Sequence, residues 1–149
     1  MEQDKFNDFN GLVTGAIKSM NRIKFKKMGQ YGLGSAHTSC LLYIHASEKG
    51  IVQTELARLC DVDKAQISRV MSHLFEREYI EESPDNTNNI YRKKYILSEK
   101  GKAVTDEIIA SIQDINNFVS KDIPREDVAV FYKTFHTICE KLKKVEENL

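Results

Sequence analysis

The sequence predicts a mainly helical protein of the α+β class, on three observations. Apolar residues recur every three or four positions through most of the 149-residue chain, which is the period of amphipathic helices. Only two prolines and seven glycines interrupt this pattern. Residues 79–97 depart from the helical period, because β-forming residues at both ends enclose a polar centre, and this predicts a β-hairpin. We expect residues 1–149 to form a single domain.

The composition excludes several classes of protein. Equal numbers of acidic and basic residues, 22 of each, give a formal net charge of zero, so any nucleic acid or anionic lipid must be bound by a local patch. No apolar run reaches the roughly 20 residues of a membrane span, and the N-terminus lacks the pattern of a signal peptide. Three widely spaced cysteines do not suggest a disulfide framework. We therefore expect a cytoplasmic protein with no membrane partner.

The periodic segments come in a definite order. Three glycines in residues 29–35 end the first segment, and Pro124 separates the last two. The helices expected in chain order are residues 5–28, a segment ending near Gly50, 53–59, 64–77, one beginning at Ser98 and one following Pro124.

Residues 53–77 contain two short helices joined by a tight turn. Leu56 and Leu59 give the first helix its apolar side, and Val62 in the turn is expected in the core. Asp63 offers an N-cap oxygen to the second helix, with Gln66 in the reciprocal capping position. The second helix should bury Ile67, Val70, Met71 and Leu74. Two such helices followed by a hairpin predict a winged helix-turn-helix over residues 35–97.

The other side of the second helix carries no acidic residue from position 64 to 73. A helix of this kind can enter the major groove of double-stranded DNA, where arginine pairs with guanine and glutamine with adenine. Consecutive cations in the hairpin suit the phosphate backbone or the minor groove. The residues expected to face DNA are Lys64, Ala65, Gln66, Ser68, Arg69, Ser72, His73, Arg92, Lys93 and Lys94. The simpler alternative is a solvated helix face and an ordinary charged strand. The alternative function is a winged helix that binds another protein without specific DNA binding.

Both ends of the chain carry long apolar stripes. In the last helix the apolar positions are spaced alternately three and four residues apart, the pattern of a helix that grips a partner helix: Val128, Phe131, Phe135, Ile138, Leu142 and Val145. We therefore expect residues 5–28 and 104–147 to be dimerisation helices of a homodimer. The alternative is that the last helix packs on the first or fifth helix of its own chain.

Taken in this order, these features resemble the MarR (multiple antibiotic resistance regulator) family of transcription factors. The matching stretches are "LARLCDVDKAQISRVMSHLFEREYIE", "SPD" at the start of the hairpin and "LSEKG" at the start of the fifth helix. The resemblance runs from about residue 5 to the C-terminus. It implies a homodimeric repressor whose two winged helices read a palindromic operator. By position, residues 64–77 are the recognition helix and Arg69 stands where the family often has a basic residue.

Two positions depart from the family pattern. Glu78 stands where a glycine commonly ends the recognition helix, so we expect that stop to be made differently. The wing reads "NNIYRKKY", apparently one residue longer than usual, with Asn89 near the place of an aspartate that would orient an arginine. We expect Arg92 to be the cation at the wing tip, with Lys93 as the alternative.

The resemblance also implies a regulatory site. Small phenolic or aromatic molecules often bind members of the family in a cleft between the dimerisation helices and the winged helix, and this can release the DNA. The residues that border this cleft by position are Val13, Ile17, Met20, His37, Leu41 and Tyr43. Their mix of apolar walls and polar tips is that of a small-molecule pocket. The alternative is that they fill the core of the junction.

Other candidate sites are weaker. The stretches "HTSC" (37–40) and "HTIC" (136–139) each place histidine and cysteine three residues apart on a helix, a spacing that can share a zinc ion. Neither has an evident third ligand, so we expect no metal and no cofactor. Redox sensing by Cys40 or Cys60 is the weaker interpretation, because buried cysteines are usually inert. No phosphate-binding loop or nucleophile elbow is present in the sequence, and we do not expect an enzyme.

Overall fold

The computed structural model describes the backbone of residues 2–85 and 92–149, and side chains from residue 8 onward. The chain divides into two compact units, Met1–Ile108 and Ile109–Leu149. In the part of the chain that the structure describes, no helix combines the length and the apolar character needed to cross a membrane.

The described residues form long helices toward both ends of the chain, with short helices and strands between them. In chain order they are α1 (Glu2–Met28), the 3-10 turn η1 (Gly29–Tyr31), α2 (Ser35–Ala46), β1 (Ile51–Val52), α3 (Gln53–Cys60), α4 (Lys64–Glu76), β2 (Ile80–Glu82), β3 (Lys94–Leu97), α5 (Glu99–Ser120) and α6 (Arg125–Glu147). The prediction of a mainly helical α+β fold is confirmed.

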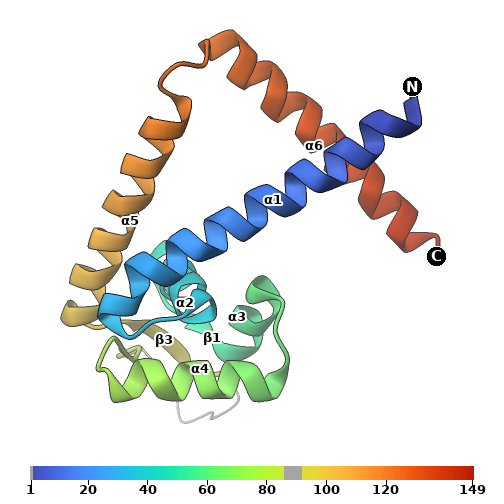
Figure 1. Ribbon diagram of the computed structural model, residues 1–149. Coiled ribbons are helices and arrows are strands. Elements are labelled where there is room, and N and C mark those ends of the chain that lie inside the picture. The colour runs from blue at the N-terminus through green and yellow to red at the C-terminus, as the bar shows by residue number, and fades with distance from the viewer. Residues whose placement is uncertain (1, 86–91) are drawn as a thin grey trace. The chain divides into compact units, whose positions relative to one another are not determined.

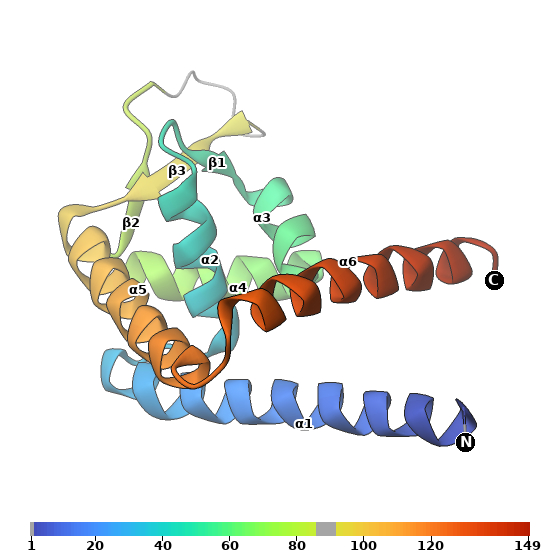
Figure 2. The same cartoon turned by 90° about the horizontal axis from the view of Figure 1, so that it is seen from above.

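The first unit contains the winged helix-turn-helix. Helices α3 and α4 follow each other around a tight turn, and α4 lies along the outer edge of this unit (Figure 1). Helix α2 lies between α1 and the strands (Figure 2). The antiparallel sheet has the order β1-β3-β2. Strand β1 was not expected, because two residues are too few to show a period of two.

The core of this unit is formed by apolar side chains from α2, α3 and α4. Leu41, Leu56 and Leu74 are fully buried, and Ile67, Val70 and Met71 are buried as predicted. Leu59 and Val62 are only half-buried, which corrects their assignment to the core. They lie at the end of α3 and in the turn, where the neighbouring Asp61 and Asp63 are exposed to solvent.

The turn between α3 and α4 is fixed by two backbone features. Asp61 adopts the left-handed conformation, with φ of 52°, and ends α3. Aspartate tolerates this conformation better than most residues. At the start of α4 the Gln66 backbone N–H donates to Asp63 Oδ1 over 2.7 Å, which confirms the predicted N-cap. The structure thus gives a local reason for the change of direction between the two helices.

The end of α4 corrects one prediction. Glu78 takes the left-handed conformation itself, with φ of 59°. Its N–H donates to the Phe75 carbonyl at 2.9 Å, and the Tyr79 N–H donates to the Leu74 carbonyl at 3.0 Å. These are the two hydrogen bonds of the Schellman motif that a glycine normally makes. The stop is therefore made in the usual way, with a glutamate in the place of glycine.

The second unit consists of the end of α5 and the helix α6. No residue of α6 is fully buried. The Phe131 and Phe135 rings stack, with centroids 5.6 Å apart and planes 12° apart. Along the predicted seam Val128, Phe135 and Ile138 are half-buried. The other seam residues are exposed, namely Phe131, Leu142 and Val145.

Candidate nucleic-acid interface

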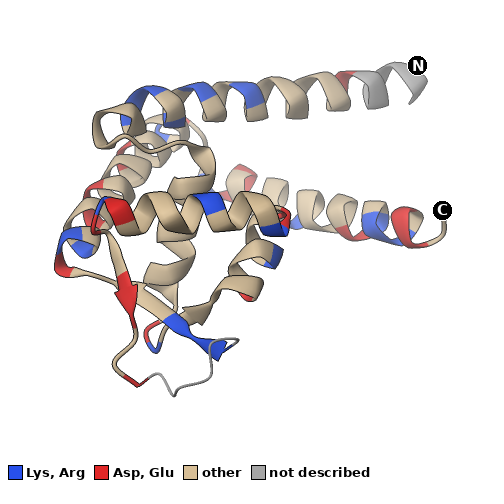
Figure 3. Ribbon diagram, turned by 90° about the horizontal axis from the view of Figure 1, so that it is seen from below, with Lys and Arg blue, Asp and Glu red and all other residues tan. Residues whose placement is uncertain are grey.

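The exposed side of α4 is made of small, polar and basic residues. The buried residues of α4, among them Ile67 and Val70, fix which side faces solvent. Opposite them, the exposed residues are Lys64, Ala65, Gln66, Ser68, Arg69 and Ser72. The first turn of α4 contains no acidic residue, and the acid at its N-terminus is the N-cap, Asp63, whose carboxylate accepts from the Gln66 N–H. Figure 3 shows Lys and Arg segments on α4 and on β3.

The wing and α4 meet at one hollow. Lys64 at the start of α4 and Lys93 just before β3 both line it, and its volume is about 490 Å³. The rest of the lining is Gln53, Thr54, Ala57, Ile67 and Tyr95. Two cations that are 29 positions apart in the sequence (93 − 64) therefore face the same surface. This arrangement is what a helix in a groove with a wing on the neighbouring backbone requires.

Ser68 is less available to DNA than the sequence suggested. Its hydroxyl donates to the Lys64 carbonyl at 2.9 Å, one turn earlier in α4. Its oxygen accepts from Gln53 Nε2 at 3.2 Å. Phosphate oxygens can only accept, so Ser68 could bond to a phosphate only by breaking its bond to Lys64. Gln53, at the start of α3, was not predicted as part of this surface, although its side chain connects α3 to α4. The strand before it, β1, is too short to give a signal in the sequence.

His73 has contacts outside the exposed side of α4. It is half-buried, and its Nε2 lies 2.8 Å from the Gly32 carbonyl oxygen and 3.2 Å from Arg77 Nε. The His73 ring also lies against His37, with centroids 4.3 Å apart. His73 also lines one hollow with Gln66 and Arg69, so its contact with DNA stays a prediction. Its contact with Gly32 connects α4 to the glycine turn before α2.

The wing cations differ in their surroundings. Lys93 Nζ lies 2.9 Å from Glu82 Oε1 on the neighbouring strand, and this pair raises the pKa of Lys93. Arg92 and Lys94 are exposed. Because Glu82 offsets the charge of Lys93, Arg92 stays our prediction for the wing-tip cation. Asn89 lies outside the described residues.

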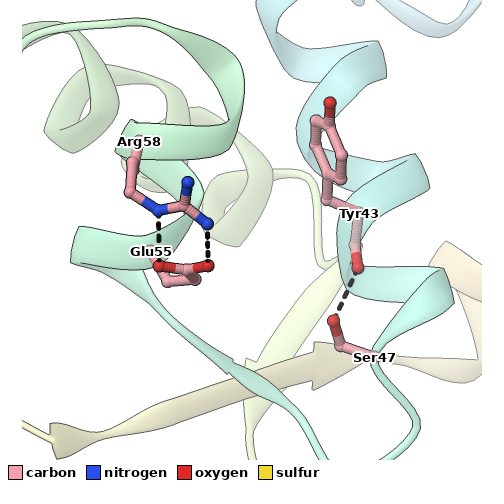
Figure 4. Close-up of polar contacts among 4 residues, drawn as sticks. All are labelled: Tyr43, Ser47, Glu55 and Arg58. Atoms are coloured by element: carbon pink, nitrogen blue, oxygen red, sulfur yellow. Dashed lines mark hydrogen bonds and ion pairs between the residues drawn. The ribbon is translucent and has the colours of Figure 1, made fainter.

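In helix α3, Arg58 forms an ion pair with Glu55 of the same helix. Arg58 Nε and Nη2 donate to the two carboxylate oxygens of Glu55, at 3.0 and 2.5 Å (Figure 4). Both side chains belong to one exposed turn of the helix. Because Glu55 offsets its charge, Arg58 is not a candidate for contacting phosphate.

The six residues predicted to border an effector cleft lie in different surroundings. Leu41 is fully buried in the core, so its side chain does not line an open cleft, which corrects that assignment. Ile17 and Met20 are about half exposed on α1, at 48% and 52%, and Val13 is half-buried. Tyr43 is exposed, and its carbonyl accepts from the Ser47 hydroxyl at 2.9 Å (Figure 4).

His37 has a structural role at the start of α2. Its Nδ1 accepts from the Gly34 backbone N–H at 2.9 Å, which caps the helix. Burial lowers the pKa of His37, and the nearby His73 and Arg77 lower it further. His37 also lines a hollow shared with Gln66, Arg69 and His73. Cys40, the other candidate zinc ligand of the "HTSC" stretch, has its sulfur 3.5 Å from the sulfur of Cys60. Among the residues searched in the structure, no group of three or more potential metal ligands is found.

These features define a class of protein. A tight helix-turn-helix with an exposed, acid-free second helix, followed by a hairpin with basic residues, is a winged helix-turn-helix. Residues 31–87 match the model of the MarR family. This match confirms that the part of the chain with the helix-turn-helix resembles the MarR family.

Known proteins extend this similarity. The chain is 31% identical over 99 residues to the HTH-type transcriptional regulator YybA of Bacillus subtilis, over 63% of this chain and 59% of YybA. The match thus spans less than two thirds of that relative. The crystal structure of MarR has a TM-score of 0.74 and 25% identity, over 94% of each chain. A DNA complex of MepR from S. aureus has a TM-score of 0.75 and 15% identity, over 88% of this chain and 94% of that one.

Proposed function

We propose that this protein is a sequence-specific DNA-binding transcriptional regulator that acts as a homodimeric repressor. The observation that carries the proposal is the shared surface of α4 and the wing, where Lys64 and Lys93 line one hollow beside an acid-free helix face. The chain as a whole has no net charge, so this local patch supplies the attraction to phosphate. The fold of the MepR–DNA complex supports the proposal.

Each residue of the patch has its own task in this proposal. Arg69 and Gln66 project from the middle of the exposed side of α4 and read base edges. Lys64 contacts a phosphate near the N-terminus of α4. Arg92 contacts the backbone or the minor groove next to the major-groove site. The small side chains of Ala65 and Ser72 let the helix come close to the bases.

Dimerisation in this proposal depends on the terminal regions. Large apolar side chains are exposed on α1, for example Leu12 and Phe25, each at 74%. Others are exposed between residues 118 and 149, for example Phe118 at 82%. Among the described residues outside these stretches, the exposed large apolar side chains are Tyr43 and Phe75, at 37% and 39%. A second copy of the chain would cover such surfaces, and two-fold symmetry would impose an inverted repeat on the operator.

The alternative function, a winged helix that binds proteins, differs in its dependence on salt. Binding to a fluorescent duplex can be followed by anisotropy while the salt concentration is raised. Each phosphate neutralised contributes a slope of about 0.9 in the logarithm of the affinity, so several contacts give a steep decline. A flat response, or no binding to any duplex at low salt, would support the protein-interaction module instead.

The proposal also includes release of the protein from DNA by a small molecule. The exposed side chains of Ile17 and Met20 on α1 supply an apolar wall for a small aromatic or phenolic effector. Such a molecule releases DNA only if it binds the DNA-incompetent arrangement more tightly. Salicylate-like anions can be titrated into the protein–operator complex, with Met20→Trp beside the wild type. Release that is unchanged in Met20→Trp would place the site elsewhere, and no release would remove this part of the proposal.

A further inference from the structure

Two cysteines from different helices face each other inside the first unit. Cys40 Sγ on α2 and Cys60 Sγ on α3 are 3.5 Å apart, and both are free thiols. They are 20 positions apart in the sequence, so the contact depends on the packing of α2 against α3. The third cysteine, Cys139, belongs to the second unit. The sequence alone gave no reason to pair Cys40 with Cys60.

We propose that Cys40 and Cys60 form a redox-active dithiol that a hydroperoxide converts to an intramolecular disulfide. In the first step the Cys60 sulfur attacks the peroxide oxygen, the O–O bond breaks, and a sulfenic acid forms with release of an alcohol or water. In the second step the Cys40 sulfur attacks the Cys60 sulfur and displaces water. Together the two thiols lose two protons and two electrons, and these reduce one peroxide to an alcohol and water, or to two waters.

The burial of the two side chains decides the order of these steps. Cys60 is half-buried and therefore reachable from solvent, whereas Cys40 is fully buried. The peroxide must meet Cys60 first, and Cys40 then acts as the resolving thiol from 3.5 Å away. Burial raises the pKa of both thiols. Because the thiolate is the reacting species, oxidation should be slow near neutral pH and should speed up as the pH rises.

Forming the bond would pull on the end of α3. A disulfide has an S–S distance of about 2.0 Å, so the 3.5 Å separation must shorten by about 1.5 Å. Cys60 is the last residue of α3, and only Asp61 and Val62 separate it from Asp63, the N-cap of α4. A shift at Cys60 is therefore passed to the start of α4 through a short turn. We therefore expect the oxidised protein to bind its operator more weakly, and this expectation rests on the proposed function.

The disulfide can be tested directly. The full-length protein is treated with hydrogen peroxide at several pH values, alkylated under denaturing conditions and weighed by mass spectrometry. The Cys139→Ser variant, treated alike, should lose two hydrogen atoms and have no thiol left to alkylate. Digestion of the wild type should give a Cys40–Cys60 linked peptide, and dithiothreitol should reverse the change. Cys60→Ser should retain an alkylatable Cys40. Oxidation of Cys60 only to higher acids, or no reaction at alkaline pH, would overturn the proposal.

A second measurement tests the effect on DNA. Anisotropy with a selected operator compares reduced protein, oxidised protein and oxidised Cys60→Ser protein. A several-fold weaker affinity after oxidation, absent in Cys60→Ser and recovered with dithiothreitol, supports the link to α4. An unchanged affinity of protein shown to contain the disulfide overturns that link. If the reduced protein binds no duplex at all, the proposed function fails while the result on the thiols still stands.

Discussion

The first turn of α5 passes directly beneath the backbone of Tyr79. A Cβ added at Gly101 would lie 1.9 Å from the Tyr79 carbonyl oxygen, a distance that no real side chain allows. The same carbonyl accepts from the Ser98 N–H at 3.1 Å. The Ser98 hydroxyl donates to the Glu78 carbonyl at 2.5 Å and accepts from the Gly101 N–H at 3.0 Å. The "LSEKG" stretch therefore fastens α5 to the segment that follows α4.

Gly101→Ala should destabilise the protein. In an open helix this change would add up to about 1 kcal/mol of stability, because alanine is the better helix former. Here the overlap is with backbone, so α5 or β2 must move, at a cost of about 1–3 kcal/mol. Urea unfolding followed by circular dichroism measures the difference. The matched control is Gly15→Ala on α1, where no atom lies within 4 Å of the added Cβ. A gain in stability for Gly101→Ala would contradict this packing.

Glu78→Gly should stabilise the protein. A residue other than glycine pays roughly 1–2 kcal/mol for the left-handed conformation that Glu78 adopts. Glycine removes this cost but loses more entropy on folding, about 0.4–1 kcal/mol, so a net gain of about 0.5–1 kcal/mol is expected. Thermal or urea unfolding provides the measurement. Glu76→Gly, inside α4, should instead lower the stability. Equal effects of the two changes would be inconsistent with the Schellman stop.

Stability should depend on pH through His37. The folded-state pKa of His37 is lowered below its ordinary value of 6.5, first by burial and then by His73 and Arg77. Below pH 6.5 the unfolded chain therefore binds more protons than the folded chain. The contribution of neutral His37 to the free energy of unfolding is therefore complete above pH 6.5, and it is lost as the pH falls toward the folded-state pKa. Urea unfolding at a series of pH values measures the slope. His37→Gln keeps an acceptor for the helix cap and should flatten this slope, and an unchanged slope would refute the assignment.

Phe135→Glu should weaken or abolish the homodimer. Phe135 lies on the apolar seam of α6 and stacks on Phe131, so a charge there would be placed in the proposed interface. Light scattering at micromolar concentration measures the mass, and circular dichroism checks that the helices remain. Lys133→Glu also places a glutamate on α6, at an exposed position outside the seam, and should leave the mass unchanged. A monomeric wild type would end the proposal of a dimer.

The sequence predicted long elements better than individual contacts. The period of three and four placed α3 and α4 within one residue of their bounds, because burial of Leu56 and Leu74 on one side dictates that pattern. It could not show that Ser68 is held by Gln53 or that His73 turns to Gly32, since these contacts join segments distant in the sequence. The approach of Cys40 to Cys60 was hidden for the same reason.

The most direct test of the central claim is selection of bound duplexes from random DNA, carried out with the wild type and with two variants. The wild type should enrich two inverted half-sites whose centres lie about one helical turn apart. Arg69→Ala should lose about 1–3 kcal/mol of binding free energy and relax the preference at one or two positions. Lys93→Ala should weaken all sequences alike and keep the selected motif. Enrichment of no motif, or an Arg69→Ala variant with the affinity and motif of the wild type, would contradict DNA reading by α4.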